Sequence, residues 1–384
     1  MTPASRPLEG VVVLDLSRVL AGPLATQLLG DLGAEVWKVE RPGSGDETRA
    51  WGPPFVGGMS AYYLSVNRNK RSAALDFRDA AHVAAIRRAA LAADVVVENF
   101  LPGDLARYGL DPATLRVAKP ELVVCSVTGF GQDGPYAALP GYDAVMQGFT
   151  GLQGITGEPE GPPLKVGVAV VDVLAGMHAA SAILAALVGR FRGRGGAHLD
   201  VSLFEAGVHS LVNVAQSALS TGAPARRHGT AHPTIVPYQT FTSGDGLAFV
   251  LAVGNDGQWR RLVGALEEEP PGGEDWARNP DRVLRRADVV GWLTRVFAAA
   301  PRERWLARLA AAEVPAGPVR EVHEVMHDPA LRERALVRDV ALPDGTATPL
   351  LSLPWRIDAA RPGVTLPPPA LGAHTAVFLA RFGG

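Results

Sequence analysis

A single carboxylate, that of Asp172, lies within the run Val166–Met177, whose other residues are all apolar or glycine. An unpaired carboxylate in an apolar environment costs free energy, so its presence needs a reason. One reason is structural, because an aspartate at the start of a helix accepts hydrogen bonds from the first backbone amides. The other is chemical, because a carboxylate held there stays ionised and oriented, as a nucleophile must be. The sequence leaves both explanations open, and they are compatible.

Several cationic side chains near predicted strand ends could bind the phosphates of a nucleotide. They are Arg41, the segment Asn67–Arg71, Arg78 and Arg107. The alternative is an ordinary solvated charged surface. The segment Gly43–Gly45 follows a predicted strand, but the residues after it do not open a helix. The dinucleotide-binding fingerprint is therefore incomplete, and NAD is not expected as a cofactor.

The segment His323–His327 reads HEVMH and matches the zinc-peptidase pattern H-E-x-x-H. That pattern needs both histidines on one continuous helix, and the following Asp328 and Pro329 are expected to end the helix at once. No third ligand is evident, so a zinc peptidase is kept only as an alternative to a surface helix. His228 and His232 also have ligand-like spacing, but neighbouring glycine and proline predict an irregular loop beside a substrate.

Length, composition and charge limit the class of protein. With 384 residues, of which 47% are hydrophobic and 20% charged, the chain is that of a globular protein large enough for two domains. Its formal net charge of −2 and the absence of a basic run argue against nucleic acid or an anionic membrane as a partner. Cys125 is the only cysteine, so no disulfide can form within the chain, and a buried inert thiol is expected.

The start of the chain and one apolar stretch bear on location. Met1–Gly10 lacks the basic-then-apolar pattern of a signal peptide, which predicts a cytoplasmic protein. Val166–Gly189 is long enough to span a bilayer. An ionised Asp172 inside it would cost about 2.5–3.5 kcal/mol, so no membrane span is expected.

The first half of the chain alternates predicted strands and helices, which implies a parallel sheet with helices on both faces. Strands are expected at Val11–Leu16, Glu35–Val39, Ala73–Phe77, Asp94–Glu98, Glu121–Val127 and His198–Phe204, and helices at Pro23–Leu32, Ala80–Ala92, Pro112–Ala118, after Asp172 and at Glu205–Ser220. The Pro-, Gly- and His-rich segment Thr221–Pro237 indicates a crossing into a smaller α+β domain, with a hairpin at Tyr238–Val253.

Eight motifs in a fixed order cover nearly the whole chain. They are Ser17–Pro23, Gly33–Asp46, Asn67–Ser72, Val97–Gly103, Ser126–Tyr136, Pro140–Asp143, Gly167–Met177 and Leu371–Thr375. Together they resemble the class III CoA-transferase family, which includes formyl-CoA transferase, carnitine CoA-transferases and α-methylacyl-CoA racemase. The resemblance implies an α/β fold with a large doubly wound parallel-sheet domain built from both chain ends, a smaller α+β domain, and an interlocked homodimer. The expected domains are residues 1–222 and 333–384 for the large one and 223–332 for the small one.

The resemblance also implies roles for individual residues. Asp172 falls on the family's catalytic aspartate. The residues that fall where relatives hold CoA are Leu20, Ala21, Arg41, Leu75, Arg78, Asn99, Phe100, Leu101, Arg107, Leu139, Pro140, Gly141 and Tyr142. Leu101 departs from the polar or basic residue of many relatives, which puts that contact in doubt. The glycine-rich lid of formyl-CoA transferase has no clear equivalent, so oxalate and formate are not expected as substrates.

The implied activity is transfer of CoA from an acyl-CoA donor to a carboxylic acid, through an aspartyl anhydride and an aspartyl-CoA thioester, with no tightly bound cofactor and no metal. The alternative within the family is racemisation, which pairs the aspartate with a histidine where this chain has Tyr142. A tyrosine of pKa about 10 is a poor second base at neutral pH, which favours transfer. The segment His228–Phe241 resembles relatives that handle dicarboxylic acids of the succinate and glutarate type. His232, Tyr238 and Gln239 are its candidate substrate residues.

Overall fold

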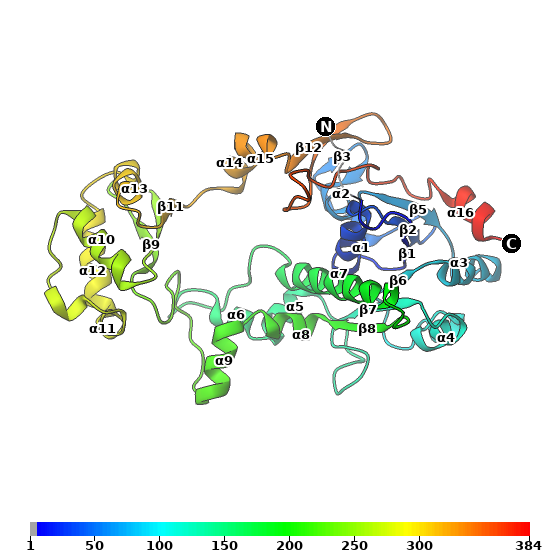
Figure 1. Cartoon of the computed structure of the whole chain (residues 1–384), viewed down its shortest axis with the longest axis horizontal. Coiled ribbons are helices and arrows are strands. Elements are labelled where there is room, and N and C mark those ends of the chain that lie inside the picture. Colours follow the sequence, from blue (N-terminus) through cyan, green and yellow to red (C-terminus); the bar gives the residue numbers. More distant parts are fainter. Residues whose placement is uncertain (1–5) are drawn as a thin grey trace. The chain divides into compact units, whose positions relative to one another are not determined.

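The computed structural model describes residues 6–384 and divides into two compact units (Figure 1). The first unit comprises the chain up to Leu152, Lys165–Ala223 and Pro329–Gly384, and the second comprises Gln153–Leu164 and Pro224–Asp328. The short segment Gln153–Leu164 belongs with the second unit, which the sequence did not indicate. The sequence prediction about a signal peptide concerned Met1–Gly10, and the first five of these residues lie outside the described residues.

The first unit is built on a six-stranded parallel sheet, which confirms the α/β prediction (Figure 1). Its strands are β1 (Val12–Asp15), β2 (Glu35–Glu40), β5 (Lys70–Ala74), β6 (Val95–Glu98), β7 (Val123–Thr128) and β8 (His198–Ser202). Their spatial order is β5-β2-β1-β6-β7-β8. The chain therefore leaves β1 toward one edge of the sheet and later returns to fill the other edge. In open α/β sheets, ligands bind in the crevice at the carboxyl ends of the strands where this reversal occurs.

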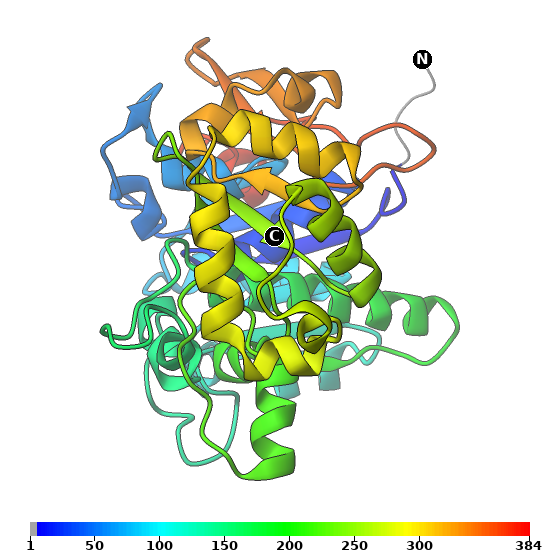
Figure 2. The same ribbon diagram turned by 90° about the vertical axis from the view of Figure 1, so that its left-hand side faces the viewer.

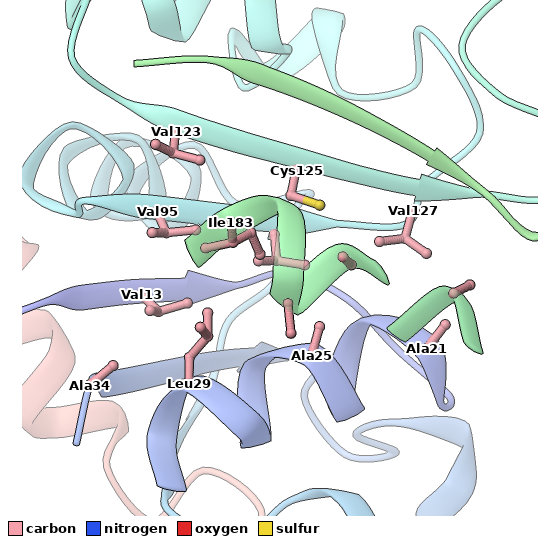
Figure 3. Close-up of a cluster of buried hydrophobic side chains, with 14 of the residues drawn as sticks. Val13, Ala21, Ala25, Leu29, Ala34, Val95, Val123, Cys125, Val127 and Ile183 are labelled. Atoms are coloured by element: carbon pink, nitrogen blue, oxygen red, sulfur yellow. The ribbon is translucent and has the colours of Figure 1, made fainter. Parts of the chain in front are cut away.

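Helices cover both faces of the sheet because successive strand residues point to opposite sides. Helices α1 (Ala21–Asp31) and α7 (Val170–Phe191) pack on the face that presents Val95 and Val97. Figure 3 shows Val95 of this face with Leu29 of α1 and Ile183 of α7. The opposite face, which presents Val96, is covered by α3, α4 and α16. These three helices are α3 (Ala80–Ala92), α4 (Pro112–Ala118) and α16 (Thr375–Phe382).

Helix α7 is long and apolar enough to cross a membrane by length and composition alone. Here Ala175, Ala179 and Ile183 are fully buried among α1 and the sheet, so α7 is the core helix of the first unit. A Cβ added to Gly176 would lie 2.6 Å from the carbonyl oxygen of Ala21. The close packing that the small residues of this helix predict is therefore packing against α1.

Shorter elements complete the first unit. They are η1 (Glu47–Ala50), β3 (Phe55–Val56), β4 (Met59–Ser60), α2 (Ala61–Val66), η2 (Ala106–Tyr108), α5 (Asp143–Phe149), α8 (Leu203–His209), α9 (Val212–Thr221), α15 (Pro329–Glu333), β12 (Val337–Ala341) and β13 (Ala347–Leu351). The helix expected at Glu205–Ser220 is thus two helices, α8 and α9, and Val212 at their junction has a positive φ of 41°. The short helix α6 (Leu152–Ile155) lies where the chain passes between the units.

The second unit has its own aromatic core, and its helices can be followed in yellow in Figure 2. The predicted hairpin is present, with β9 (Tyr238–Thr242) antiparallel to β10 (Ala248–Ala252) and β11 (Ala316–Pro318) on the other side of β10. Its helices are α10 (Asp256–Leu266), η3 (Gly273–Trp276), α11 (Asn279–Leu284), α12 (Arg286–Phe297), α13 (Arg302–Ala311) and α14 (Val322–Met326). Trp259, Trp276 and Trp292 pack together at ring-centroid distances of 6.0–6.1 Å.

Candidate active site

Asp172 lies in the first turn of α7, two residues after its first residue, and it does not cap the helix. The N-cap position is Ala169, whose side chain makes no capping hydrogen bond. The capping carboxylate comes from Asp143 of α5, which accepts hydrogen bonds from the amides of Val171 at 2.8 Å and of Asp172 at 3.4 Å. The structural explanation for Asp172 as an N-cap is therefore wrong. Within residues 6–384 its carboxylate has no hydrogen-bond or ion-pair partner, so its oxygens are available for chemistry.

The surroundings of Asp172 favour its protonated form. Burial raises the pKa of the Asp172 carboxyl to about 7, and the negative charge of Asp143 adds to the effect. The phenol of Tyr62, on α2, responds in the same way, because burial and then Asp172 raise its pKa to about 12. A carboxylate that titrates near neutrality in a pocket is typical of a functional group rather than of a structural ion pair.

Asp143 is itself fixed by Gln147, one turn further along α5. The Gln147 side-chain amide donates to Asp143 Oδ2 at 2.7 Å and to the carbonyl of Val168 at 3.1 Å. Its oxygen accepts from the amide of Val166 at 2.8 Å. Helix α5 therefore holds both the loop that leads into α7 and the first turn of α7 that carries Asp172.

Asp172 opens onto a pocket of about 270 Å³ at the carboxyl ends of β1, β6 and β7, which we call the thioester pocket. Its lining includes Arg18, Leu20, Ala21, Asn99, Phe100, Leu101, Asp104, Thr128, Gly129, Leu139, Pro140, Gly141 and Tyr142. One wall depends on two glycines, since a Cβ added to Gly141 would lie 2.5 Å from the Cα of Gly129. The loop that ends in Tyr142 can approach the turn after β7 only because neither residue carries a side chain.

The start of α1 lies at this pocket, since Leu20 and Ala21 line it. Its N-cap residue, Leu20, provides no side-chain hydrogen bond, and Pro23 in the first turn has no N–H. Within the described part of the chain the amides of Leu20, Ala21 and Gly22 have no hydrogen-bond partner. Unpaired amides at a helix start can stabilise negative charge that develops on an oxygen nearby.

A second pocket, of about 440 Å³, shares Arg18, Phe100 and Asp104 with the thioester pocket. We call it the nucleotide pocket. Its lining includes Arg41, Leu75, Phe77, Arg78, Arg107 and Tyr108. Phe77 contacts Tyr108 and Phe100 at centroid distances of 5.1 and 5.8 Å, which makes an aromatic wall. The pocket thus combines flat apolar surface with four arginines, Arg18 among them, a combination suited to a base and phosphate groups.

The structure brings together Asp172 and all the residues to which the resemblance gives a CoA-binding role, because each of them lines one of these two pockets. The candidate substrate residues His232, Tyr238 and Gln239 lie in the second unit, on β9 and the loop before it. The His232 and Tyr238 rings are 5.4 Å apart. Their role stays a prediction. Sequence reasoning missed Arg18 and Asp143 as site residues, although both lie inside the motifs that carry the resemblance.

Most of the cation cluster Asn67–Arg71 is buried, so it is neither a solvated surface nor open to a nucleotide. Arg68 pairs with Asp31 at 2.5 Å, Lys70 with Asp15 at 3.0 Å and Arg71 with Glu35 at 3.0 Å. The first two pairs are buried. The cluster is therefore part of the interior of the first unit.

Most of the HEVMH segment lies in the short helix α14, which ends at Met326, just before the second histidine, as the following Asp328-Pro329 predicts. The His323 and His327 rings are 5.1 Å apart, and His327 Nδ1 lies 2.7 Å from the carbonyl oxygen of His323. Among residues 6–384 no group of three or more His, Cys, Asp or Glu side chains could hold a metal ion. The zinc-peptidase alternative therefore gains no support from the structure.

Comparisons with known proteins agree on one family. A model of the family described as CoA-transferase family III matches residues 8–375. The chain is 43% identical over 390 residues to the succinate–glutarate CoA-transferase of Agrobacterium fabrum, covering 97% of this chain and 95% of that protein. It is 40% identical over 375 residues to the succinyl-CoA:glutarate CoA-transferase of Homo sapiens, covering 97% and 85%. A crystal structure of a CAIB/BAIF family protein from Brucella suis aligns with a TM-score of 0.86 and 42% identity, covering 98% of this chain and 100% of that one.

Proposed function

The chain belongs to CoA-transferase family III and is a CoA-transferase, and we propose that it exchanges CoA between dicarboxylic acids with the Asp172 carboxylate as the nucleophile. One observation carries the proposal. The Asp172 carboxylate is buried and has no partner in residues 6–384, yet it opens onto a pocket whose wall is shared with a second, arginine-lined pocket. A group in that position has the access and the electrostatic setting that covalent catalysis requires.

The chemistry proceeds in four balanced exchanges at Asp172. Its carboxylate attacks the carbonyl carbon of the donor thioester, and CoA thiolate leaves to give a mixed anhydride. The thiolate then attacks the aspartyl carbonyl of the anhydride and releases the donor acid as its carboxylate. The acceptor carboxylate attacks the resulting aspartyl-CoA thioester, which expels CoA thiolate and gives a second anhydride. The thiolate finally attacks the acceptor's carbonyl to give the new acyl-CoA and free Asp172.

Each exchange passes through a tetrahedral oxyanion. The amides of Leu20, Ala21 and Gly22 are the proposed donors to it, because they are unpaired and two of these residues line the thioester pocket. The exchange converts one thioester and one carboxylate into another pair of the same kind. No nucleoside triphosphate is needed to drive it.

The two pockets give CoA a continuous path. A CoA molecule with its thioester beside Asp172 and its adenine against Phe77 and Tyr108 must pass Arg18, which lines both pockets. Arg18 lies over the Phe100 ring at 5.6 Å and pairs with Glu47, and both side chains of that pair are 46% exposed. It is therefore accessible to the phosphates between the two ends of CoA, and Arg41 and Arg107 complete the cationic surface.

Dicarboxylic acids are the proposed substrates because the similar transferases of Agrobacterium fabrum and Homo sapiens carry succinate and glutarate in their names. His232, Tyr238 and Gln239 of the second unit are the proposed contacts for the second carboxylate. Free acids with four or five carbons are the acceptors to test first.

The test is a panel of CoA donors and acceptor acids read by mass spectrometry. We expect CoA to move from succinyl-CoA to glutarate, with no transfer by Asp172→Asn or Asp172→Ala, and hydroxylamine added with acyl-CoA should modify wild-type protein at Asp172 alone. If none of the dicarboxylates in the panel accepts CoA, the proposed substrate class is refuted. Transfer that survives in Asp172→Ala would refute the nucleophile.

Racemisation was the alternative that the sequence left open within the family. The position that needs a second base is occupied by Tyr142, which is 61% exposed at the rim of the thioester pocket. Incubation with a chiral 2-methylacyl-CoA in deuterated water separates the two reactions, since the transferase leaves the α-carbon undeuterated when no acceptor is present. α-Deuteration under those conditions would establish racemisation instead.

The proposed enzyme is a homodimer of interlocked chains. Met177, Val188 and Phe191 lie on one face of α7 and are 50–69% exposed, and on α9 Val212 and Leu219 are 70% and 82% exposed. Apolar side chains so placed on the core helix of the first unit are expected to be covered by a second copy of the chain.

A further inference from the structure

Four charged side chains that take no part in the proposed bond-making steps are buried beneath the loop Ser17–Pro23, and one of them, Asp46, also lines the nucleotide pocket. They are Asp15, Lys38, Asp46 and Lys70, each no more than 1% exposed. Lys38 pairs with Asp46 at 2.9 Å and Lys70 with Asp15 at 3.0 Å. Removing four charges from water costs more than ion pairing reliably returns, so their burial calls for a role beyond stability.

Each member of this network also holds the backbone of the loop. The Lys38 ammonium donates to the carbonyl of Ser17 at 2.8 Å, and the Lys70 ammonium donates to the carbonyl of Pro23 at 2.8 Å. The amide of Ser17 donates to Asp15 at 2.9 Å. The amide of Val19 donates to Asp46 at 3.2 Å. The network therefore hydrogen-bonds the loop backbone at Ser17, at Val19 and at Pro23.

These hydrogen bonds hold Val19 in a backbone conformation that its residue type does not favour. Val19 has a φ of +72°, in the left-handed region that a β-branched residue rarely adopts, at a cost of about 1–3 kcal/mol. Asn99 fixes the neighbouring Arg18 on both sides, accepting from its amide at 3.0 Å and donating to its carbonyl at 2.8 Å. The next residues along the chain are Leu20, Ala21 and Gly22. Their amides have no partner within the described chain.

We propose that Lys38 and Lys70, with their partners Asp46 and Asp15, are positioning residues for CoA transfer, which aim the amides of Leu20–Gly22 at the reacting thioester. The inference rests on the proposed function. Asp15 and Lys70 carry opposite charges at neutral pH, as this role requires. Burial opposes ionisation of Asp15, but Lys70 and Lys38 outweigh it and hold its pKa at about 2. Burial lowers the pKa of Lys70 to about 8, with Asp15 opposing the effect.

The test compares two variants that disturb the network in different ways. Asp46→Asn keeps an oxygen for the amides of Val19 and Thr48 but removes the charge that faces Lys38. Lys38→Met keeps an unbranched side chain one atom shorter than lysine but removes the ammonium that donates to the Ser17 carbonyl. Both should slow single-turnover formation of the aspartyl-CoA thioester at Asp172 by about tenfold or more, while KM for the donor changes by less than about threefold. Using both variants guards against the failure of one of them to fold.

The matched control is Asp31→Asn. The Asp31–Arg68 pair is buried in the same unit and lies at the other end of α1, without contact with the loop. The midpoint temperature of thermal unfolding should fall to a similar degree in Asp31→Asn and Asp46→Asn. Only Asp46→Asn should show a slower single-turnover reaction. Wild-type rates in both Asp46→Asn and Lys38→Met, or an equal loss in Asp31→Asn, would overturn the inference. Absence of transfer by wild-type protein in the same assay would instead refute the proposed function.

Discussion

Asp172 combines a carboxylate that has no partner among residues 6–384 with a place on the wall of the thioester pocket. Because burial raises the pKa of its carboxyl to about 7, only part of the enzyme is in the nucleophilic form at neutral pH. We expect the single-turnover rate of aspartyl-CoA formation to rise with pH, and to fall roughly tenfold for each pH unit below about 7.

The contribution of Asp143 to the raised pKa of Asp172 can be tested separately from the contribution of burial. The titratable groups facing Asp172 are Asp143 on α5 and Tyr62 on α2, and Tyr62 stays neutral because its pKa is about 12. Asp143→Asn should therefore move the midpoint of the rate profile to lower pH, while Tyr62→Phe should leave the effect of Asp143 in place. A midpoint unchanged in Asp143→Asn would show that burial alone sets the pKa.

The same carboxylate should make the protein less stable at high pH. An unfolded aspartate loses its proton near pH 3.8, whereas folded Asp172 keeps it up to about pH 7. The folded state binds more protons in this window, so its stability falls as pH rises from about 4 to 7 and stays reduced above. Asp172→Asn should raise the free energy of unfolding at pH 8 by about 1–3 kcal/mol and change it little at pH 4. Equal effects at both pH values in urea unfolding would contradict this account.

Much of the site could be predicted from residue types in local motifs. Pairs of residues far apart in the sequence could not be predicted. Asp172 stood out because its neighbours are apolar, which is visible in the sequence. The burial of Lys70 was not visible, because its partner Asp15 lies 55 positions away and only the parallel sheet brings them together. A charged run such as Asn67–Arg71 indicates a surface until the fold supplies its counter-charges.

At the scale of elements, the approach of α7 to α1 determines where Asp172 and the Leu20–Gly22 amides lie. A Cβ at Gly176 would lie 2.6 Å from the Ala21 carbonyl, whereas nothing lies within 4 Å of one at Gly189 in the same helix. Gly176→Ala should destabilise the protein by about 1–3 kcal/mol and reduce transfer, because the helices must separate. Gly189→Ala should stabilise it by up to about 1 kcal/mol through helix propensity. Similar unfolding curves for the two variants would contradict this packing.

Helix boundaries show which elements the sequence could define. Helices α3 and α4 have the predicted bounds because their caps, Asp79 and Asp111, are adjacent in sequence and hydrogen-bond the first turn. Strand β5 begins at Lys70 rather than at the predicted Ala73, because pairing with β2 extends it into the charged run. Capping is a local interaction and sheet pairing is not, so the first could be predicted and the second could not.

The short helix α14 gives a separate prediction for metal dependence. His323 and His327 have no third ligand among the described residues, and the helix that carries His323 ends at Met326, before His327. Prolonged treatment with EDTA should therefore leave CoA transfer within about 20% of the untreated rate, since the proposed mechanism takes its electrostatic stabilisation from backbone amides. Loss of activity that zinc restores would revive the metal hypothesis.

At the scale of the whole molecule, the composition of α7 has two competing explanations. A membrane-spanning helix should be apolar all round, yet α7 buries Ala175, Ala179 and Ile183 inside its own unit and carries Asp172 at its start. What remains exposed is one face with Met177, Val188 and Phe191. A face of this kind on a core helix fits contact with another protein surface better than contact with lipid.

If a second copy of the chain covers this face and the two chains interlock, they can separate only by unfolding. Analytical ultracentrifugation should then give twice the mass of one chain, with no monomer on dilution, because dissociation and unfolding become one step. The double substitution Val188→Glu and Phe191→Glu should reduce soluble dimer, whereas Leu284→Glu, at a position 83% exposed in the second unit, should not. A stable monomer with full transfer activity would contradict the dimer, and vesicle binding by wild-type protein would favour the membrane explanation.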